Sequence, residues 1–330
     1  MVASIGDSWT QFYGYYTGPV MKALAGAYGD AGTGWTGLGF GGPGGAYLNG
    51  TAAYPASSVS GWSNVADWSY DEYDAVPSPD LAATASSVSG TWMTVSNGPA
   101  GCSSVALFAL GTSDGVLRYR WNGGAWTDLS VAGQGLLTFP LSGLPSTAWT
   151  LDLEVASGTV NLAGLDVRKA GAGIRLHKLG GTGSRAAQWA AVDGTQWQAG
   201  LAALDPRLVT VLLGTNDQAC YDATAFKGYV QTMIDRIRAA VPAADILLVA
   251  PPENFAGRPR PMSDYATALY ELAQANGCAF LDLQFVFGAS LADYAAGSSR
   301  PWFDPDGIHP SAEGAVAVTD AILRLLFPPL

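Results

Sequence analysis

Charged side chains are scarce in this 330-residue chain, at 13% of the residues, and most of them are acidic. The chain has 16 lysines and arginines against 27 aspartates and glutamates, which gives a formal net charge of −11. Nucleic acids and anionic membrane surfaces are bound through clustered basic side chains, so this composition argues against both as partners. Apolar residues make up 48% of the chain, which is typical of a folded globular protein.

Long apolar runs are also missing, and none approaches the roughly 18 residues of a membrane-spanning helix. A strand is expected from residue 2, which leaves no room for a secretory leader in this chain. This start favours either a protein that is not exported by that route or one whose leader has been removed. The low lysine content and the abundance of Gly, Ser and Trp favour an extracellular, cell-surface or particle-associated protein.

Cysteine and histidine are rare. The three cysteines, Cys102, Cys220 and Cys278, are odd in number and form no C-x-x-C pair. They therefore predict neither a zinc site nor a complete disulfide framework, and we interpret them as small buried hydrophobic residues. Of the two histidines, His177 lies in the strand-like run GIRLHKL and is interpreted as a structural or surface residue, which leaves His309 as the candidate for chemistry.

From Asp205 onward, strand-like and helical patterns alternate. Strands are expected at LVTVLL (208–213), ILLVA (246–250) and AFLDL (279–283). Helices are expected from the spacing of Phe226, Val230, Ile234, Ile237 and Val241, between a Ser263 cap and Gly277, and at a terminal segment ending in AILRLLF (321–327). This alternation predicts a parallel sheet covered by helices on both faces.

Residues of about 80 to 172 follow another pattern, with short aromatic and β-branched segments separated by turn residues. The segments are TWMTV, SVALFAL, VLRYRWN, LLTFPL, WTLDLEV and VNLAGLDV. They predict an antiparallel β-sandwich inserted into an α/β domain, with segments 1–79, 80–172 and 173–330. The Gly- and Trp-rich stretch at 26–62 is interpreted as a surface or cleft-lining loop.

Two formal motif matches are rejected. GTSDG (111–115) fits the G-x-S-x-G nucleophile elbow, but Ser113 lies between two strand-like runs, which favours a hairpin turn. GTGWTG (32–37) fits G-x-G-x-x-G, yet no clear strand precedes it and no acidic residue follows at the distance of a ribose partner. Neither a nucleophile elbow nor a dinucleotide site is therefore expected.

A nucleophile, a base and an orienting carboxylate can be assembled from two other segments. Ser8 follows a strand in VASIGDSWTQ, so its hydroxyl is expected at the carboxyl end of the sheet. In DGIHPS (306–311), Asp306 and His309 are three residues apart, a spacing that lets the carboxylate orient the imidazole. A serine hydroxyl needs such a base to become a nucleophile at neutral pH.

Donors for an oxyanion are expected from two further segments. LLGTNDQ (212–218) places Asn216 after a strand, and LGGTGSRAAQW (179–189) offers a turn at Gly183. The side-chain amide of Asn216 with the backbone N–H groups of Ser8 and Gly183 would supply three donors. Asp217 lacks the spacing of a base with its orienter, and Asp7 is interpreted as stabilising the turn.

In these four blocks the chain resembles the SGNH/GDSL hydrolase family. GDS at 6–8, the block with Gly183, GTND at 214–217 and D-x-x-H at 306–309 occur in the family's order. The resemblance implies a three-layer α/β/α sandwich, ester hydrolysis without metal or other cofactor, and the roles given above to the five residues. One departure is Lys178, which stands where an Asn commonly precedes the glycine by five positions.

The inserted β-domain is similar to the arrangement in carbohydrate esterases that remove O-acetyl groups from polysaccharides or peptidoglycan. We therefore expect a serine esterase that acts on an acylated carbohydrate, with sugar binding by the insertion as an open question. Three tryptophans adjoin the expected site and are candidates for substrate binding: Trp9, Trp35 and Trp189. Three on the insertion are candidates for stacking on sugar rings: Trp121, Trp126 and Trp149. A lipase or thioesterase with the same site, or a non-catalytic glycan-binding adhesin, remain alternatives.

Overall fold

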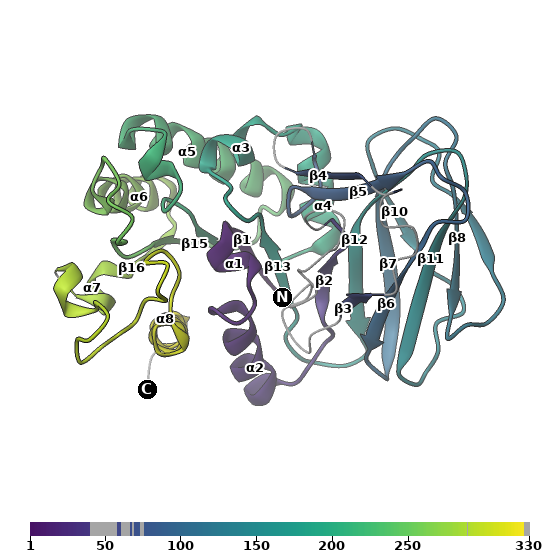
Figure 1. Cartoon of the computed structure of the whole chain (residues 1–330), viewed down its shortest axis with the longest axis horizontal. Helices are drawn as coiled ribbons and strands as arrows, with labels where there is room; N and C mark the ends of the chain where they lie inside the picture. Colours follow the sequence, from purple (N-terminus) through teal and green to yellow (C-terminus); the bar gives the residue numbers. More distant parts are fainter. Residues whose placement is uncertain (40–57, 61–66, 68, 73–75, 289, 327–330) are drawn as a thin grey trace.

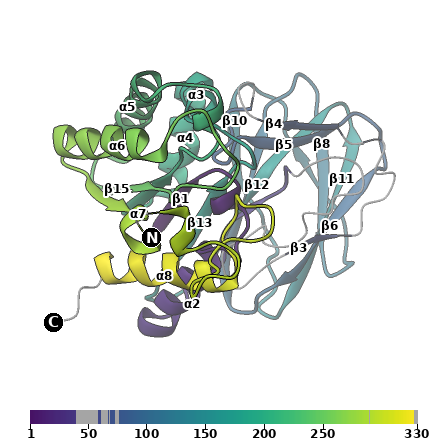
Figure 2. The same ribbon diagram turned by 60° about the vertical axis from the view of Figure 1, so that its left-hand side comes forward.

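The computed structural model describes residues 1–39, 58–60, 67, 69–72, 76–288 and 290–326. An α/β part and an all-β part lie side by side in it (Figures 1 and 2). No helix in these described ranges has both the length and the apolar character that crossing a bilayer requires.

A five-stranded parallel sheet forms the centre of the α/β part, in the order β13-β1-β14-β15-β16. Alternate side chains face opposite sides of this sheet, so Ile5 packs on one face and Val2 on the other. Both faces of the sheet are thus apolar and must be shielded from water by other elements. The strands are β1 (Val2–Gly6), β13 (Leu176–Gly180), β14 (Leu208–Leu212), β15 (Asp245–Ala250) and β16 (Ala279–Asp282).

Helices cover both faces of this sheet, which confirms the predicted three-layer α/β/α sandwich (Figure 1). One face packs against α3 (Ala186–Ala191), α4 (Gly194–Leu204), α5 (Ala223–Ala240) and α6 (Met262–Asn276). The other packs against α2 (Thr17–Tyr28), α7 (Gln284–Phe287) and α8 (Ala312–Leu326). The short helix α1 (Ser8–Gln11) and the 3₁₀ helices η3 (Asp217–Ala219) and η4 (Leu291–Asp293) complete this part.

Of the two caps predicted for α6, the one at the carboxyl end is confirmed and the one at the amino end is wrong. Gly277 ends the helix at φ +62°, as predicted, because glycine adopts this left-handed conformation without strain. At the other end the helix begins at Met262, one residue before Ser263, with Pro261 at the cap position. The Glu253 side chain accepts the Met262 N–H at 2.7 Å, so a distant carboxylate takes the role that had been expected of Ser263.

Two antiparallel sheets form the all-β part, which confirms an inserted antiparallel β-domain. Their facing side chains enclose a core of their own, with Leu107, Leu153 and Leu165 among its members. One sheet has the order β10-β7-β12-β5-β4, with β2 also paired to β12, and the other has the order β3-β6-β11-β8-β9. The strands are β2 (Gly34–Gly37), β3 (Ser58–Ser60), β4 (Ser69–Glu72), β5 (Ala82–Ser86), β6 (Trp92–Gly98), β7 (Cys102–Leu110), β8 (Val116–Trp121), β9 (Thr127–Ser130), β10 (Leu136–Pro140), β11 (Trp149–Ser157) and β12 (Val160–Lys169).

Two local predictions in this region were wrong. GTSDG (111–115) is not a hairpin turn, because β7 and β8 on either side of it belong to different sheets and do not pair. The stretch 26–62 is not one loop, since its described residues include the end of α2 and the strands β2 and β3, whereas 40–57 and 61–62 lie outside the described residues. The predicted domain boundaries remain a proposal, with segments 1–79, 80–172 and 173–330. The first segment also supplies strands to the β-domain, because β2, β3 and β4 pair with strands of that domain.

One cluster of apolar side chains joins the two parts, in addition to the separate core within the β-domain. Trp35 and Phe108 from the β-domain pack in the same cluster as Ile5 and Leu179 of the parallel sheet. His177 of β13 is also buried here, and burial lowers its pKa to about 3, so it is neutral at pH 7. This burial confirms the structural role of His177. The apolar cluster that joins the two parts makes the β-domain an integral part of the fold.

Candidate active site

Ser8 lies just past the carboxyl end of β1, an inner strand of the parallel sheet between β13 and β14. Gly6 ends the strand where a Cβ would come within 2.4 Å of the Leu212 carbonyl oxygen, so only glycine fits. Asp7 then caps α1, because its Oδ1 accepts the Trp9 N–H at 3.0 Å. This cap confirms the turn-stabilising interpretation of Asp7, and it turns the chain so that Ser8 becomes the first residue of the helix.

The Ser8 hydroxyl contacts the imidazole of His309, although 301 positions separate the two in sequence. Ser8 Oγ lies 2.8 Å from His309 Nε2, and His309 Nδ1 lies 2.5 Å from Asp306 Oδ2. Burial alone would raise the pKa of Asp306, but hydrogen bonds from His309 and from the Ile308 N–H outweigh it and lower that pKa. The carboxylate is therefore ionised at neutral pH and can orient the ring and stabilise an imidazolium.

The loop that carries Asp306 and His309 is held on both sides. Asp306 Oδ1 accepts the N–H groups of Ile308 at 2.8 Å and His309 at 3.0 Å. Gly307 adopts φ +69°, and its carbonyl oxygen accepts the Phe255 N–H at 2.8 Å. These bonds fix the loop before α8, so the imidazole is pre-positioned.

Two aromatic side chains near Ser8 support this loop. The indole N–H of Trp9 donates to the Ile308 carbonyl oxygen at 3.0 Å. The Tyr15 ring stacks on the His309 ring at a centroid distance of 5.3 Å and an interplanar angle of 18°. The sequence offered a signal for Tyr15, since QFYGYYTG is rich in aromatics directly after the GDS block, but this contact was not predicted.

Asn216 links the other two segments to the serine. Its Nδ2 lies 3.1 Å from the Ser184 carbonyl oxygen and 3.3 Å from Asp7 Oδ2. Ser184 follows Gly183, and Asp7 precedes Ser8, so the three expected oxyanion donors gather at one end of the sheet. Gly183 is exposed and has φ +77°, a conformation that favours glycine.

Two buried carboxyl groups lie behind these donors. Burial raises the pKa of Asp7 to about 7, and the nearby charge of Asp217 adds to this. Burial also raises the pKa of Asp217 to about 7, although its Oδ1 accepts the Ala186 N–H at 3.0 Å. Asp217 Oδ2 is buried without a hydrogen-bond partner. Because Asp217 is fully buried, it is poorly placed to act as the general base, in line with the preference for His309.

The three tryptophans expected to bind substrate are all buried, with at most 1% of their surface exposed: Trp9, Trp35 and Trp189. Trp35 donates its indole N–H to Asp80 Oδ2 at 2.6 Å, and Trp189 donates to Ser184 Oγ at 3.0 Å. This burial disagrees with the expectation that their rings contact a substrate. Instead, each indole N–H holds a segment near the site in place.

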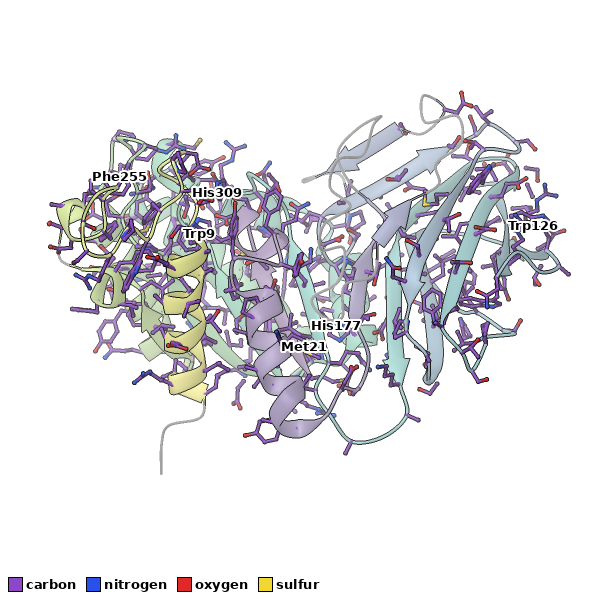
Figure 3. The ribbon with its side chains drawn as sticks, turned by 60° about the horizontal axis from the view of Figure 1, so that its bottom comes forward. Trp9, Met21, Trp126, His177, Phe255 and His309 are labelled. Carbon is purple, nitrogen blue, oxygen red and sulfur yellow. The ribbon has the colours of Figure 1, made fainter. Side chains whose placement is uncertain are left out.

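On the β-domain the three candidate tryptophans differ in exposure. Trp149 is buried, and the Trp121 ring packs edge-on against it at 5.1 Å. Trp126 is half-buried, with the guanidinium groups of Arg118 and Arg120 at 5.0 and 4.3 Å from its ring centre. Figure 3 places Trp126 at the opposite end of the molecule from His309. Sugar stacking there would be remote from the candidate triad.

The cysteines are free, and none is fully buried: Cys220 is exposed, and Cys102 and Cys278 are half-buried, which corrects the interpretation of all three as buried residues. Its Sγ accepts a hydrogen bond from Arg185 Nη1 at 3.1 Å. Among the residues that the structure describes, no cluster of His, Cys, Asp and Glu could hold a metal ion.

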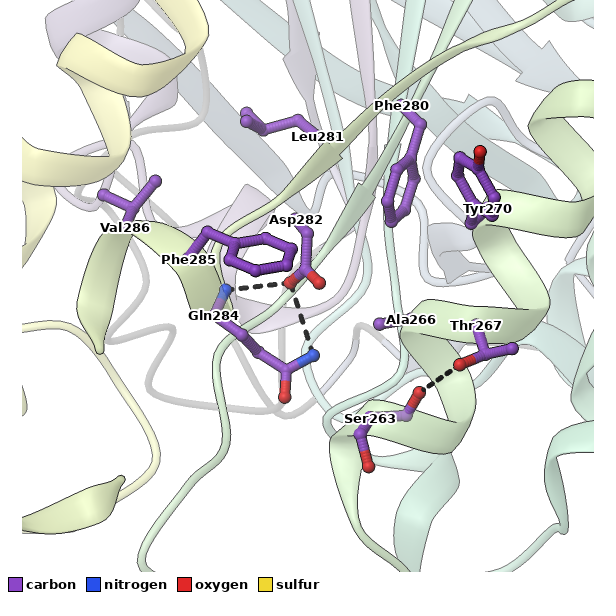
Figure 4. Close-up of a pocket in the computed structure, with 10 residues that line it drawn as sticks. All are labelled: Ser263, Ala266, Thr267, Tyr270, Phe280, Leu281, Asp282, Gln284, Phe285 and Val286. Carbon is purple, nitrogen blue, oxygen red and sulfur yellow. Dashed lines mark hydrogen bonds between the residues drawn. The ribbon is translucent and has the colours of Figure 1, made fainter. Parts of the chain in front are cut away.

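An open pocket of about 700 Å³ lies between α6, β16 and α7, with Tyr270, Phe280 and Phe285 along its wall (Figure 4). Phe285 is 90% exposed. None of the five candidate residues lines this pocket, so it is separate from the site around Ser8.

Residues 160–317 match the GDSL-like Lipase/Acylhydrolase family. No curated protein matches the chain. A solved peptidoglycan O-acetylesterase is similar at a TM-score of 0.78 and 20% identity, over 98% of this chain and 89% of that one. An acetylxylan esterase from Geobacillus stearothermophilus has a TM-score of 0.39 and 21% identity, over 48% of this chain and 74% of that one. A family two carbohydrate esterase from Cellvibrio japonicus has a TM-score of 0.34 and 10% identity, over 82% of this chain and 97% of that one.

The family match includes Gly183, Asn216, Asp306 and His309, whereas Ser8 lies upstream of it because the β-domain is inserted between the first block and the others. The likeness at 20% identity shows a shared fold across almost the entire chain. Residues 160–317, slightly less than half of the chain, are therefore similar to the GDSL-like lipase/acylhydrolase (SGNH) family, which is a family of carboxylic ester hydrolases.

Proposed function

We propose that this esterase removes small acyl groups, chiefly acetyl, from a carbohydrate, with Ser8 as the nucleophile. The observation that carries the proposal is the hydrogen-bonded chain from Ser8 Oγ through both ring nitrogens of His309 to Asp306. Such a chain gives a serine hydroxyl its base and gives that base its orientation.

The reaction proceeds in two halves. Ser8 Oγ attacks the ester carbonyl carbon and passes its proton to His309 Nε2. The resulting oxyanion accepts hydrogen bonds from the N–H groups of Ser8 and Gly183 and from Asn216 Nδ2, which exchanges its 3.3 Å contact with Asp7 Oδ2 for the oxyanion. Each donor is worth about 2.7 to 4 kcal/mol of the barrier. His309 then protonates the departing sugar oxygen, which leaves an acylated Ser8.

Water completes the cycle. His309 removes a proton from a water molecule, which attacks the acyl-serine carbonyl carbon, and the same three donors stabilise the second oxyanion. The bond to Ser8 Oγ breaks, the proton returns to that oxygen, and the free acid leaves. Asp306 stays ionised throughout, in keeping with its lowered pKa.

The choice of an acetylated carbohydrate is supported by the fold. The likeness to a peptidoglycan O-acetylesterase extends over the β-domain as well as the α/β part. Peptidoglycan is accordingly the first polysaccharide to test, with acetylated xylan as the second.

The test is a series of p-nitrophenyl esters from acetate to decanoate, followed by acetate release from O-acetylated peptidoglycan and xylan. Ser8→Ala is compared with Ser113→Ala, which removes the exposed serine of the rejected GTSDG match. We expect activity confined to short esters, lost in Ser8→Ala and kept in Ser113→Ala. Preference for decanoate would favour a lipase, and binding of acetylated glycan without acid release would favour an adhesin.

A further inference from the structure

A buried set of polar contacts joins the helix that begins with Ser8 to the loop that carries Gly183. The two segments are distant in sequence, but Gly180 at the end of β13 touches α1 directly. A Cβ at Gly180 would lie 2.3 Å from the backbone nitrogen of Gln11. Gln11, the last residue of α1, is therefore placed beside the Gly183 loop.

The Gln11 side chain binds this loop one residue before the candidate oxyanion donor. Its Oε1 accepts hydrogen bonds from both the backbone N–H and the hydroxyl of Thr182. The Gly183 N–H belongs to the next peptide group. Since glycine at φ +77° permits peptide rotation at little cost, the orientation of that N–H depends on how its neighbours are held.

The neighbour on the other side is also held. The Ser184 N–H donates to the Gly181 carbonyl oxygen at 2.9 Å, and the Gly181 N–H donates to the Gly6 carbonyl oxygen at 2.9 Å. The Ser184 hydroxyl also donates to the Gly6 carbonyl oxygen at 3.4 Å, so Gln11 anchors one flank of Gly183 while the end of β1 contacts the other.

Lys178 in turn holds Gln11. This lysine is 95% buried, and its Nζ donates to the Gln11 carbonyl oxygen at 2.6 Å. A buried ammonium group needs compensation, and the carboxylate of Asp80 from the β-domain supplies the opposite charge. Asp80 is itself fixed by hydrogen bonds from Trp35 at 2.6 Å and from Ser78 at 2.9 Å.

We propose that Gln11 is a positioning residue for the Gly183 donor of the oxyanion hole, and that Lys178 and Asp80 keep Gln11 in place. The proposal rests on the function proposed above, because it assigns Gly183 to the oxyanion. It also gives the β-domain a part in the chemistry. Through Asp80 and Trp35 this domain supports the loop that binds the developing charge, independently of any contact with a glycan.

The test replaces Gln11 with Met, which has a similar length and no acceptor for the Thr182 N–H. The control is Gln134→Met at an exposed turn of the β-domain. With p-nitrophenyl acetate we expect Gln11→Met to lower kcat roughly 10- to 100-fold while KM changes less than about 3-fold, since the lost interaction acts on the transition state. Inactivation by an organophosphate, which forms a tetrahedral adduct at the serine, should slow by a similar factor.

Ser8→Ala, measured in parallel, separates the two proposals. Wild-type kcat in Gln11→Met beside an inactive Ser8→Ala would overturn the positioning role and leave the serine mechanism standing. A raised KM with unchanged kcat would also overturn it, because Gln11 would then serve ground-state binding. Full activity of Ser8→Ala would remove both proposals. Should Gln11→Met fail to fold, Gln11→Asn, which keeps the amide but shortens its reach, must show the same loss of kcat.

Discussion

Replacing Asp217 with Asn should make the protein more stable at neutral pH, and the gain should depend on pH. In the folded chain, burial raises the pKa of Asp217 from its usual 3.8 to about 7. In the unfolded chain the carboxyl ionises near 3.8, so between these two pH values the folded state retains a proton that the unfolded state has lost. Raising the pH through this window therefore favours unfolding.

The size of the effect follows from the width of the window. When the folded state binds one proton more than the unfolded state, the free energy of unfolding falls by about 1.4 kcal/mol per pH unit. Between pH 3.8 and about 7 the protein therefore loses roughly 4 kcal/mol of stability. The variant has no such penalty, and its amide oxygen can still accept the Ala186 N–H that Asp217 Oδ1 accepts now. The charge of Asp217 also raises the pKa of Asp7, so the variant should relieve part of that cost as well.

The assay is urea unfolding of both proteins at pH 5 and pH 7.5. We expect the free energy of unfolding of Asp217→Asn, relative to wild type, to rise by about 3 kcal/mol between these pH values. Taking the difference between the two proteins cancels the contributions of other groups, such as His177, whose lowered pKa acts with the opposite sign. A difference that stays constant with pH, or that shrinks as the pH rises, would refute the reasoning.

Three further substitutions test separate parts of the structure. Asp306→Ala should lower kcat on p-nitrophenyl acetate roughly 10³- to 10⁴-fold, because His309 loses its orienting carboxylate, and a loss below 10-fold would speak against that role. Gly180→Ala should lower both the melting temperature and kcat, since its Cβ would force α1 away from β13, and unchanged values would contradict this contact. Trp126→Ala should weaken sedimentation with insoluble peptidoglycan if this half-buried ring stacks on sugar, while the rate on p-nitrophenyl acetate stays that of wild type. Equal sedimentation of both proteins would exclude that ring as a glycan contact.

Much of the α/β part could be predicted because its signals are local. The strands β14, β15 and β16 are short and mostly apolar, and α5 buries Phe226, Val230, Ile234 and Ile237 at helical spacing, as the sequence indicated. Glycine ended α6 where it was expected to. These features depend on neighbours within a few residues.

The β-domain was predicted less completely, for a compositional reason. Its six aromatic and β-branched segments became strands, but β5 (AATAS) and β9 (TDLS) carry small and polar residues and were missed. The strand β2 (GWTG) was taken as loop for the same reason. These segments are strands because of their pairing partners, as β2 is through β12, and a partner more than 100 positions away leaves no local signal.

In the candidate site, too, contacts between residues close in sequence could be predicted better than contacts between distant ones. The spacing of Asp306 and His309 is local, so their contact could be predicted, whereas the place of Ser8 beside them followed from the order of the motifs. The burial of Trp9 and Trp35 could not be predicted, because each indole N–H has its partner in a segment distant in sequence.

The serine mechanism requires that Ser8 carries the acyl group during turnover. The most direct measurement is rapid acid quenching of the enzyme during turnover of p-nitrophenyl acetate, followed by mass spectrometry of the intact chain and of its peptides. We expect one added acetyl group, located on Ser8 and absent from Ser8→Ala. An acetyl group on another residue that also forms in Ser8→Ala, with turnover retained, would contradict it.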